Sequence, residues 1–385
     1  MVVLGDKIQH TLNPKEENVV VKVKEDNLLP TSGRHAIRVD SMPSRINSKA
    51  EFYLTDKEDV FNNFKADGIP AVWVPVSLSH IEEGDIIRVS SGDNQLRVLT
   101  KKSHRQNSFL LTERCNNWCI MCSQPPRDID DSYIVDDIME AIKLLDLNTR
   151  EIGFTGGEPT LVGDHFFRLI QATKNYLPRT ALHILSNGRN FAKEQLAKRV
   201  GDIAHHDLMI GIPIYADNAS DHNYVVQADA FEETIEGIYN LKRHGVKVEI
   251  RVVLHSATYE RLPELARYIT RNLLFVDQVA LMGLEAMGFG KSNFQSLWIS
   301  PEELIPKVDE AIAILHRAKI HTMVYNLPLC VLGELSQTRA VRSISDWKNE
   351  YLDECNSCTK KAECCGFFFS TKQHYKNLLK PFIDA

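Results

Sequence analysis

Residues 108–122 read SFLLTERCNNWCIMC, and this stretch decides the fold of the chain. An apolar, strand-like run passes directly into a loop with three cysteines. Counting this first run, six strand-like runs follow one another, at Ser108–Thr112, Glu151–Thr155, Ala181–Ser186, Leu208–Ile214, Val246–Leu254 and Val276–Met282. Amphipathic stretches separate them. The pattern therefore predicts an α/β fold with a parallel sheet and helices outside it, either a partial (β/α)6 barrel or a doubly wound sheet.

Two of the intervening stretches carry a clear helical stripe. The apolar positions are Ile134, Ile138, Ile142 and Leu145 in the first, and Phe231, Ile235, Ile238 and Leu241 in the second. Gly245 ends the second run. In both architectures the chemistry lies at the carboxyl ends of the strands, where the three-cysteine loop also falls.

The rest of the chain divides into a front and a tail. Residues 1–107 lack strong helical periodicity and alternate apolar with polar residues, which predicts a small β-rich barrel or sandwich. We expect the partial TIM-type barrel to occupy residues 108–317. A cysteine-rich C-terminal extension then covers residues 318–385. A chain of 385 residues has room for all three parts.

Composition and charge narrow the class of protein. Hydrophobic residues make up 43% of the chain and charged residues 25%, as in soluble globular proteins. The net charge of −6 gives no reason to expect a nucleic-acid partner. The sequence has neither a signal-peptide pattern nor an apolar run long enough to cross a membrane. We therefore expect a cytoplasmic protein whose eight cysteines are metal ligands or redox groups.

Cys115, Cys119 and Cys122 are candidate ligands of an iron–sulfur cluster. Three thiolates can hold three irons of a [4Fe–4S] cubane, which leaves the fourth iron without a protein ligand. Such an iron can chelate the amino and carboxylate groups of a cofactor and pass it an electron. The alternatives are a zinc site and an ordinary electron-transfer cluster. Both need a fourth ligand, which the neighbouring sequence lacks.

The Cys-x3-Cys-x2-Cys spacing after the first strand of a βα series resembles the radical S-adenosyl-L-methionine (SAM) superfamily, over roughly residues 108–290. Gly156-Gly157-Glu158-Pro159 looks like the GGEP motif of that family, which implies contacts with the amino group of the SAM methionine. A tight βα turn is the alternative. Ser186 and Asn187 stand where the family places its ribose contacts, or they form a capping turn.

The resemblance implies further SAM contacts. Alternation puts Glu249 and Arg251 on the inner face of the fifth strand, where Arg251 binds the SAM carboxylate or pairs with Glu249. Glu285 ends a segment that looks like the one near the adenine. The residue before the third cysteine is commonly aromatic in the family. Here it is Met121, whose thioether can cover a ring face, and Trp118 is a second candidate for that role.

The tail contains a second group of cysteines. Cys330, Cys355, Cys358 and Cys364 supply four thiolates, enough to close an iron–sulfur or a zinc site. Their pattern resembles the auxiliary-cluster tails of radical SAM enzymes that modify peptides, which favours an auxiliary [4Fe–4S] cluster. Adjacent side chains seldom point at one small cluster, and the family pattern favours Cys364 over Cys365 as the ligand.

Residues 111–126 and 343–351 further resemble the HxsC-like maturases of the His-Xaa-Ser system. This resemblance implies reductive cleavage of SAM to a 5′-deoxyadenosyl radical that modifies a ribosomally made peptide or protein. It also implies a second radical SAM partner protein and a low-potential electron donor. The alternatives are a radical SAM enzyme that acts on a small nucleobase-like molecule, a non-catalytic iron–sulfur sensor or scaffold, and a zinc-binding interaction protein.

Overall fold

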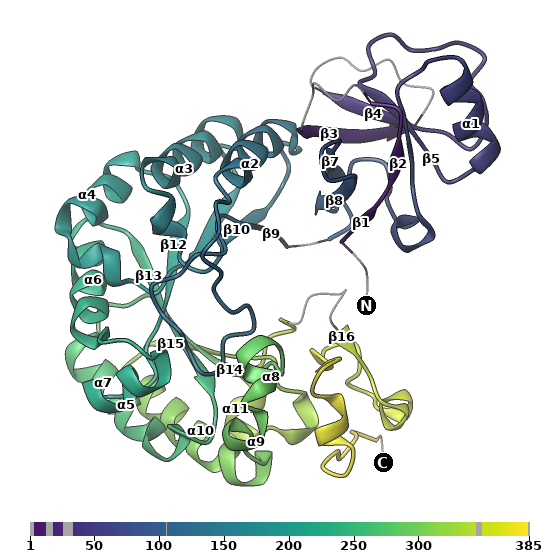
Figure 1. Ribbon diagram of the computed structural model, residues 1–385. Coiled ribbons are helices and arrows are strands. Elements are labelled where there is room, and N and C mark those ends of the chain that lie inside the picture. Colours follow the sequence, from purple (N-terminus) through teal and green to yellow (C-terminus); the bar gives the residue numbers. More distant parts are fainter. Residues whose placement is uncertain (1–3, 13–17, 26–33, 105, 344–348, 384–385) are drawn as a thin grey trace. The chain divides into compact units, whose positions relative to one another are not determined.

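A computed structural model describes residues 4–12, 18–25, 34–104, 106–343 and 349–383 (Figure 1). The chain forms two compact units. The first comprises residues 1–109, 132–153 and 168–181, and the second comprises residues 110–131, 154–167 and 182–385. Every helix among the described residues is too short or too polar to cross a membrane.

The front of the chain is a closed β-barrel. Its strands are β1 (Gly5–Lys7), β2 (Gln9–His10), β3 (Asn18–Glu25), β4 (His35–Arg38), β5 (Phe52–Thr55), β6 (Ala71–Trp73), β7 (Ile86–Ser90) and β8 (Gln95–Thr100). They lie in the order β1-β8-β7-β3-β4-β5-β6-β2. Because only Ile8 separates β1 from β2, the two ends of the sheet are joined through one short piece of chain. The β-rich front that the sequence predicts is thus a barrel.

Side-chain alternation fills this barrel with apolar residues. Val19, Val21 and Val23 of β3 point into one buried cluster. The helix α1 (Glu58–Ala66) packs Phe64 against Tyr53 of β5 on the opposite face, with ring centroids 4.8 Å apart. The sheet is therefore buried on the inside and covered on part of the outside.

A second sheet follows, with all its strands in chain order. It contains β9 (Asn107–Leu110), β10 (Glu151–Thr155), β11 (Ala181–Leu185), β12 (Leu208–Pro213), β13 (Lys247–Leu254), β14 (Gln278–Gly283) and β15 (His321–Tyr325). The pairs from β11 to β15 are parallel. A doubly wound sheet would reverse its strand order at a switch point, and this order has no reversal. The fold is therefore the partial barrel, with β9 and β15 at its two ends.

The strand count differs from the sequence prediction. The sequence analysis found six strand-like runs, whereas the sheet has β15 as a seventh strand beyond residue 317. This strand follows α10 (Pro301–Arg317), so the βα alternation continues past the expected end of the barrel. The run is short, and of its two buried residues, Thr322 and Val324, only Val324 is apolar, so the sequence carries little strand signal there.

Helices pack against the outer side of these strands. Figure 1 shows α4 (Glu194–Ile203), α6 (Phe231–Arg243), α7 (Leu262–Asn272) and α10 along this side. The stripe expected in α6 is confirmed, because Phe231, Ile235, Ile238 and Leu241 are all buried. In α2 (Tyr133–Leu144), Ile138 and Ile142 are buried, while Ile134 and Leu145 are only partly covered.

Candidate functional site

The cysteine loop (residues 111–122) follows directly after β9. Its start is fixed by Asp131, a buried carboxylate that accepts hydrogen bonds from the hydroxyl of Thr112 at 2.8 Å and the N–H of Glu113 at 2.6 Å. Near its end, the N–H of Cys122 donates to the carbonyl of Cys119 at 3.0 Å. The chain between these points is held in a compact, irregular turn at the carboxyl end of the first strand.

The three sulfurs of this loop are partly buried, and none is in a disulfide. Burial raises the pKa of Cys115 to about 11 and also raises the pKa values of Cys119 and Cys122. Negative charge on Cys122 and Cys115 raises the pKa of Cys119 further, so the three thiols share one electrostatic environment. A bound cation would reverse this effect, because metal binding displaces the thiol protons.

Among the residues that the structure describes, no group of three or more His, Cys, Asp or Glu side chains is arranged to hold a single metal ion. A cubane has a different requirement, because each of its cysteines binds a different iron. Three thiols that share one environment within a single loop provide a donor set for such a cluster.

The GGEP loop (residues 156–159) follows β10 and pairs with the cysteine loop. The N–H of Gly157 donates to the carbonyl of Thr112 at 2.8 Å, and the N–H of Glu158 donates to that of Arg114 at 2.8 Å. A Cβ atom on Gly157 would lie 2.2 Å from the carbonyl oxygen of Arg114, and one on Gly156 would lie 2.7 Å from that of Thr112. Both glycines are therefore needed for the close approach of the two loops.

Glu158 is wholly buried, and its carboxylate binds other parts of the chain. It accepts hydrogen bonds from the hydroxyl of Thr160 at 2.6 Å, the hydroxyl of Ser186 at 2.9 Å and the N–H of Asn187 at 2.7 Å. Burial raises the pKa of Glu158, and these hydrogen bonds act in the opposite direction. This buried side chain therefore connects the GGEP loop to the turn after β11.

The SN turn (residues 186–188) completes the set of linked loops. The hydroxyl of Ser186 accepts the N–H of Gly188 at 3.1 Å, and the side-chain amide of Asn187 donates to Oδ1 of Asn116 at 2.6 Å. The expected ribose ligands therefore contact the GGEP loop and the cysteine loop in this structure. Hydrogen bonds connect the loops that follow the first three strands into one network.

Glu249 and Arg251 lie together on β13, and the guanidinium of Arg251 donates to the carboxylate of Glu249. A second guanidinium nitrogen is 2.9 Å from Sδ of Met282. Burial alone would raise the pKa of Glu249. The ring of His183, with Nε2 3.5 Å from the carboxylate, and the charge of Arg251 outweigh it, and they lower the pKa to about 2. Of the two roles weighed for Arg251, this arrangement forms the buried pair.

Met121 is buried in an apolar cluster with Tyr215 and Leu284, while Glu285 next to Leu284 is half-buried. The sequence analysis did not single out Tyr215, which follows β12 by two residues. Burial raises its pKa, as do the charges of Cys119 and Cys122, which places this phenol beside the cysteine loop. Its position just beyond a strand end was the available signal.

His255 directly follows β13 and was also missed by the sequence analysis. Its ring is fully buried, and neither ring nitrogen has a hydrogen-bond partner. The ring centroid is 6.2 Å from that of Tyr215. Burial lowers the pKa of His255 to about 4, so the ring is neutral at neutral pH.

The tail cysteines (Cys330, Cys355, Cys358 and Cys364) line one small cavity. They come from the turn after β15, from the 3-10 helix Asp353–Ser357 and its end, and from the segment before β17 (Phe367–Phe368). Tyr351, Phe367 and Phe382 are among the other lining residues. The structure therefore brings together four cysteines that are up to 34 positions apart in the chain.

Cys364 and Cys365 have different surroundings. Sγ of Cys364 accepts the N–H of Leu329 at 3.3 Å and that of Gly366 at 3.4 Å, while the thiol of Cys365 donates to the carbonyl of Leu327 at 3.1 Å. The adjacent Cys365 side chain and the N–H groups of Gly366 and Leu329, opposed by burial, lower the pKa of Cys364 to about 6, whereas Cys364 and burial raise the pKa of Cys365. Cys365 does not line the cavity of the tail cysteines. These contacts favour Cys364 as the ligand.

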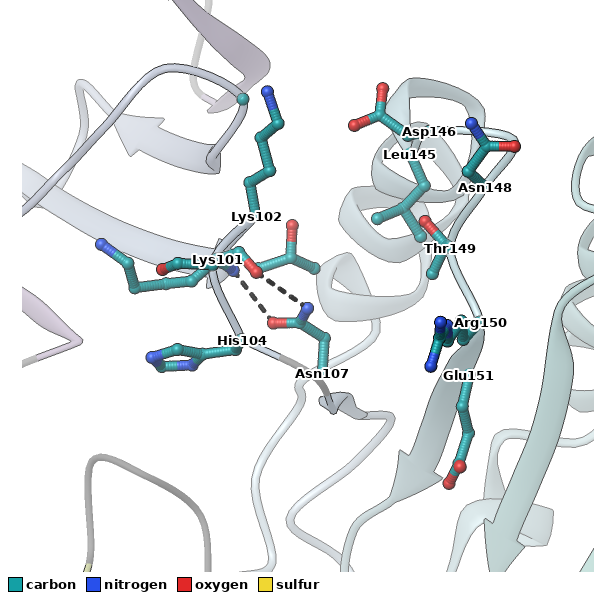
Figure 2. A pocket seen from close by; sticks show the side chains of 13 residues that line it. Lys101, Lys102, His104, Asn107, Leu145, Asp146, Asn148, Thr149, Arg150 and Glu151 are labelled. Atoms are coloured by element: carbon teal, nitrogen blue, oxygen red, sulfur yellow. Dashed lines mark hydrogen bonds between the residues drawn. The ribbon is translucent and has the colours of Figure 1, made fainter.

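A larger cavity of about 560 Å³ lies in the first unit (Figure 2). Residues 84, 100–104, 107, 145–146 and 148–151 line it, and none of them is a candidate ligand. Asn107 exchanges two hydrogen bonds with the main chain of Lys101, at 2.9 Å and 3.0 Å. The ammonium of Lys101 pairs with the buried carboxylate of Asp85 at 3.0 Å. The positive charge of Lys101 is therefore neutralised, while Lys102 also lines the cavity.

Comparison with known proteins identifies the domain that carries the cysteine loop. Residues 109–269 match the model of the radical SAM superfamily. The GTP 3′,8-cyclase of Aliarcobacter butzleri is 30% identical over 150 residues, which cover 37% of this chain and 44% of that protein. The pre-heme d1 synthase of Dinoroseobacter shibae is 27% identical over 186 residues, covering 48% and 44%. The chain spans about half the length of the curated relatives it matches.

Among solved structures, Streptococcus suis SuiB bound to S-adenosylmethionine aligns with a TM-score of 0.46 and 13% sequence identity, over 59% of this chain and 50% of that one. The family match starts within β9 and includes the cysteine loop, the GGEP loop and the SN turn. The part of the chain from residue 109 to residue 269 is therefore a radical SAM domain.

Proposed function

We propose that this protein is a radical SAM enzyme that modifies a ribosomally made peptide or protein. The observation that carries the proposal is the hydrogen-bonded network of the cysteine loop, the GGEP loop and the SN turn at the carboxyl ends of β9, β10 and β11. Parallel barrels place their reactive groups at this end. Because the three loops are bound to one another, the cysteines are held in place before any cofactor arrives.

In this proposal, Cys115, Cys119 and Cys122 hold a [4Fe–4S] cluster, and SAM binds beside it. When bound, the cluster and SAM supply one-electron radical chemistry, while the protein supplies orientation and shelter from water. The main chain of Gly156, Gly157 and Pro159 would bind the methionine end of SAM, and the buried carboxylate of Glu158 would hold this loop in place. Ser186 and Asn187 would contact the ribose, Met121 and Glu285 would contact the adenine, and Arg251, paired with Glu249 in this structure, would bind the carboxylate.

We further propose that the tail cysteines hold an auxiliary [4Fe–4S] cluster. Their convergence on one cavity supports this assignment, because a cubane closed by the protein needs four thiolates. Cys365 stays outside the cluster as a hydrogen-bond donor. In this arrangement residues 1–107 are a β-barrel support, residues 108–317 together with β15 are a catalytic barrel, and the rest of residues 318–385 is a cluster-binding extension.

The peptide substrate is inferred from the tail. The pattern of the tail cysteines resembles that of radical SAM enzymes that modify peptides, and the resemblance to the HxsC-like maturases leads to the same substrate class. Part of that resemblance, at residues 344–348, lies outside the described residues. A second radical SAM protein and a low-potential electron donor are the partners that this function requires.

A second candidate is a reaction on a small nucleobase-like molecule. The observation in its favour is that several of the curated relatives are GTP 3′,8-cyclases. Their matches cover 37–54% of this chain, so this second candidate applies to the whole protein a similarity that is found in only part of it.

One experiment separates these functions. The protein is reconstituted anaerobically with iron and sulfide and supplied with SAM and dithionite, and 5′-deoxyadenosine is measured with either GTP or peptides encoded beside this gene. We expect formation that increases with peptide, together with a mass change in that peptide. Stimulation by GTP alone would favour the second candidate, and a reducible cluster without SAM cleavage would identify a sensor or scaffold.

A further inference from the structure

We propose that Arg189 is a positioning residue that sets the reduction potential of the cluster held by Cys115, Cys119 and Cys122. The proposal rests on the proposed function, because it needs a cluster at this loop. Arg189 follows the SN turn and begins the 3-10 helix Arg189–Ala192. The sequence analysis assigned it no role.

The guanidinium of Arg189 connects a helix to the cysteine loop. Its Nη1 donates to the carbonyl of Asn116 at 2.6 Å and to Oδ1 of Asn117 at 2.9 Å. On its other side, Nε donates to the carboxylate of Glu233 in α6 at 2.6 Å. The side chain is only 16% exposed, so these contacts lie largely away from solvent. The guanidinium holds its donors in a rigid planar fork, which suits it to bind both sides at once.

The carbonyl of Asn116, to which Arg189 donates, belongs to a peptide group that also contacts a candidate cluster ligand. The carbonyl of Asn116 and the N–H of Asn117 are parts of one planar peptide unit and point in opposite directions. That N–H donates to Sγ of Cys115 at 3.4 Å. By holding the oxygen, Arg189 therefore fixes the direction of the hydrogen bond to a cluster ligand.

Two physical effects follow for a bound cluster, and both have the same sign. A hydrogen bond to a thiolate sulfur stabilises the more negative, reduced cluster, and cluster potentials depend on such bonds. A cation bonded to the peptide oxygen also polarises the N–H and strengthens its donation. Loss of Arg189 therefore makes the cluster harder to reduce.

The matched control is Arg199, which pairs with Asp164 at 2.8 Å on the surface of the same unit. Both side chains of this pair are well exposed, and an ion pair of this kind contributes little to stability. Arg199→Gln removes the same charge as Arg189→Gln, without a contact to the cysteine loop.

The test is a potentiometric titration of the anaerobically reconstituted full chain, followed by electron paramagnetic resonance. The front cluster is recognised because SAM changes its signal. For Arg189→Gln we expect about a tenfold lower equilibrium constant for reduction, which is a shift of 59 mV to more negative potential for one electron. Arg189→Lys should shift by less, and Arg199→Gln should match the wild type.

The outcomes separate this inference from the proposed function. Wild-type potential in an Arg189→Gln protein with full iron content would overturn the role of Arg189 and leave the enzyme intact. Loss of the front iron from both Arg189 variants would also overturn it, because Arg189 would then serve loop folding alone. A wild-type protein that takes up no cluster at the front cysteines would remove the proposed function itself.

Discussion

The two cysteine groups of this protein are brought together in different ways. The front group places three cysteines in eight consecutive residues, on a loop held by its neighbours. The tail group gathers four cysteines from a segment of 35 residues around one cavity. Burial raises the pKa of all three front thiols and of Cys330 and Cys355 in the tail, whereas hydrogen bonds lower the pKa of Cys364.

This difference indicates different tasks. Three ligands leave one iron of a cubane open to a cofactor, while four ligands close the cluster. A local loop fixed by hydrogen bonds suits a site where geometry must be reproduced for every turnover. A site assembled from distant segments contributes to folding of the tail when the metal binds. The following predictions test whether the two groups differ in this way.

The largest effect is expected from Cys119→Ala. This change removes the central ligand of the front group and should reduce 5′-deoxyadenosine formation to the rate without enzyme, because two thiolates no longer hold the cluster next to SAM. Chromatography of anaerobic reaction mixtures measures the product. Unchanged SAM turnover in this variant would show that the cysteine loop is not the site of chemistry.

Cys355→Ala should separate the two groups. We expect SAM cleavage within about tenfold of the wild type, equivalent to about 1.4 kcal/mol in the barrier, together with loss of the modified peptide. The readout is the ratio of 5′-deoxyadenosine to product, measured by mass spectrometry. If Cys355→Ala and Cys119→Ala abolish cleavage equally, the two clusters act as one unit.

The neighbouring cysteines of the tail provide a sharper comparison. Cys364→Ala should lose the iron and sulfide of the auxiliary cluster, whereas Cys365→Ala should keep both, because Cys365 donates to Leu327 and does not line the cavity. Metal analysis of the reconstituted variants decides this. The reverse pattern of iron loss would assign the ligand to Cys365.

The smallest expected effect is a loss of stability in acid of the barrel that carries the cysteine loop. Burial lowers the pKa of His222 and His255 from 6.5 to about 4. The unfolded chain then binds more protons than the folded chain between these values, so the free energy of unfolding falls as pH drops from 6.5 to 4. The upper limit is about 3 kcal/mol for each histidine.

Urea unfolding of the cluster-free protein at pH 7.5 and pH 5 measures this loss. His255→Gln should show a smaller difference between the two pH values than the wild type, because one titrating ring is gone. Tyr259→Phe, a change at a half-buried tyrosine in the same unit, is the control and should keep the full difference. An equal acid effect in the His255 variant would contradict the buried, neutral ring.

The sequence was sufficient for features that are local. The cysteine spacing, the glycines of the GGEP loop and the stripe of α6 are each contained in a short window, and the βα rhythm predicted the parallel sheet. Contacts between distant residues could not be derived in this way. Arg189 reaches Asn116 across 73 positions, and Glu158 reaches Asn187 across 29.

Residues at strand ends were the other omission. Tyr215 and His255 have no motif around them, and their environment is known only once β12 and β13 lie side by side. The glycines of the GGEP loop also gained a reason that the sequence had not supplied. They allow the main chain to approach Arg114 and Thr112, in addition to any ligand.

The short strands β1 and β2 have a practical consequence for handling this protein. Residues 5–10 pair with the outer edges of β8 and β6 and so close the front barrel. A shortened chain that starts after residue 10 would expose two strand edges to neighbouring molecules, and exposed edges promote aggregation.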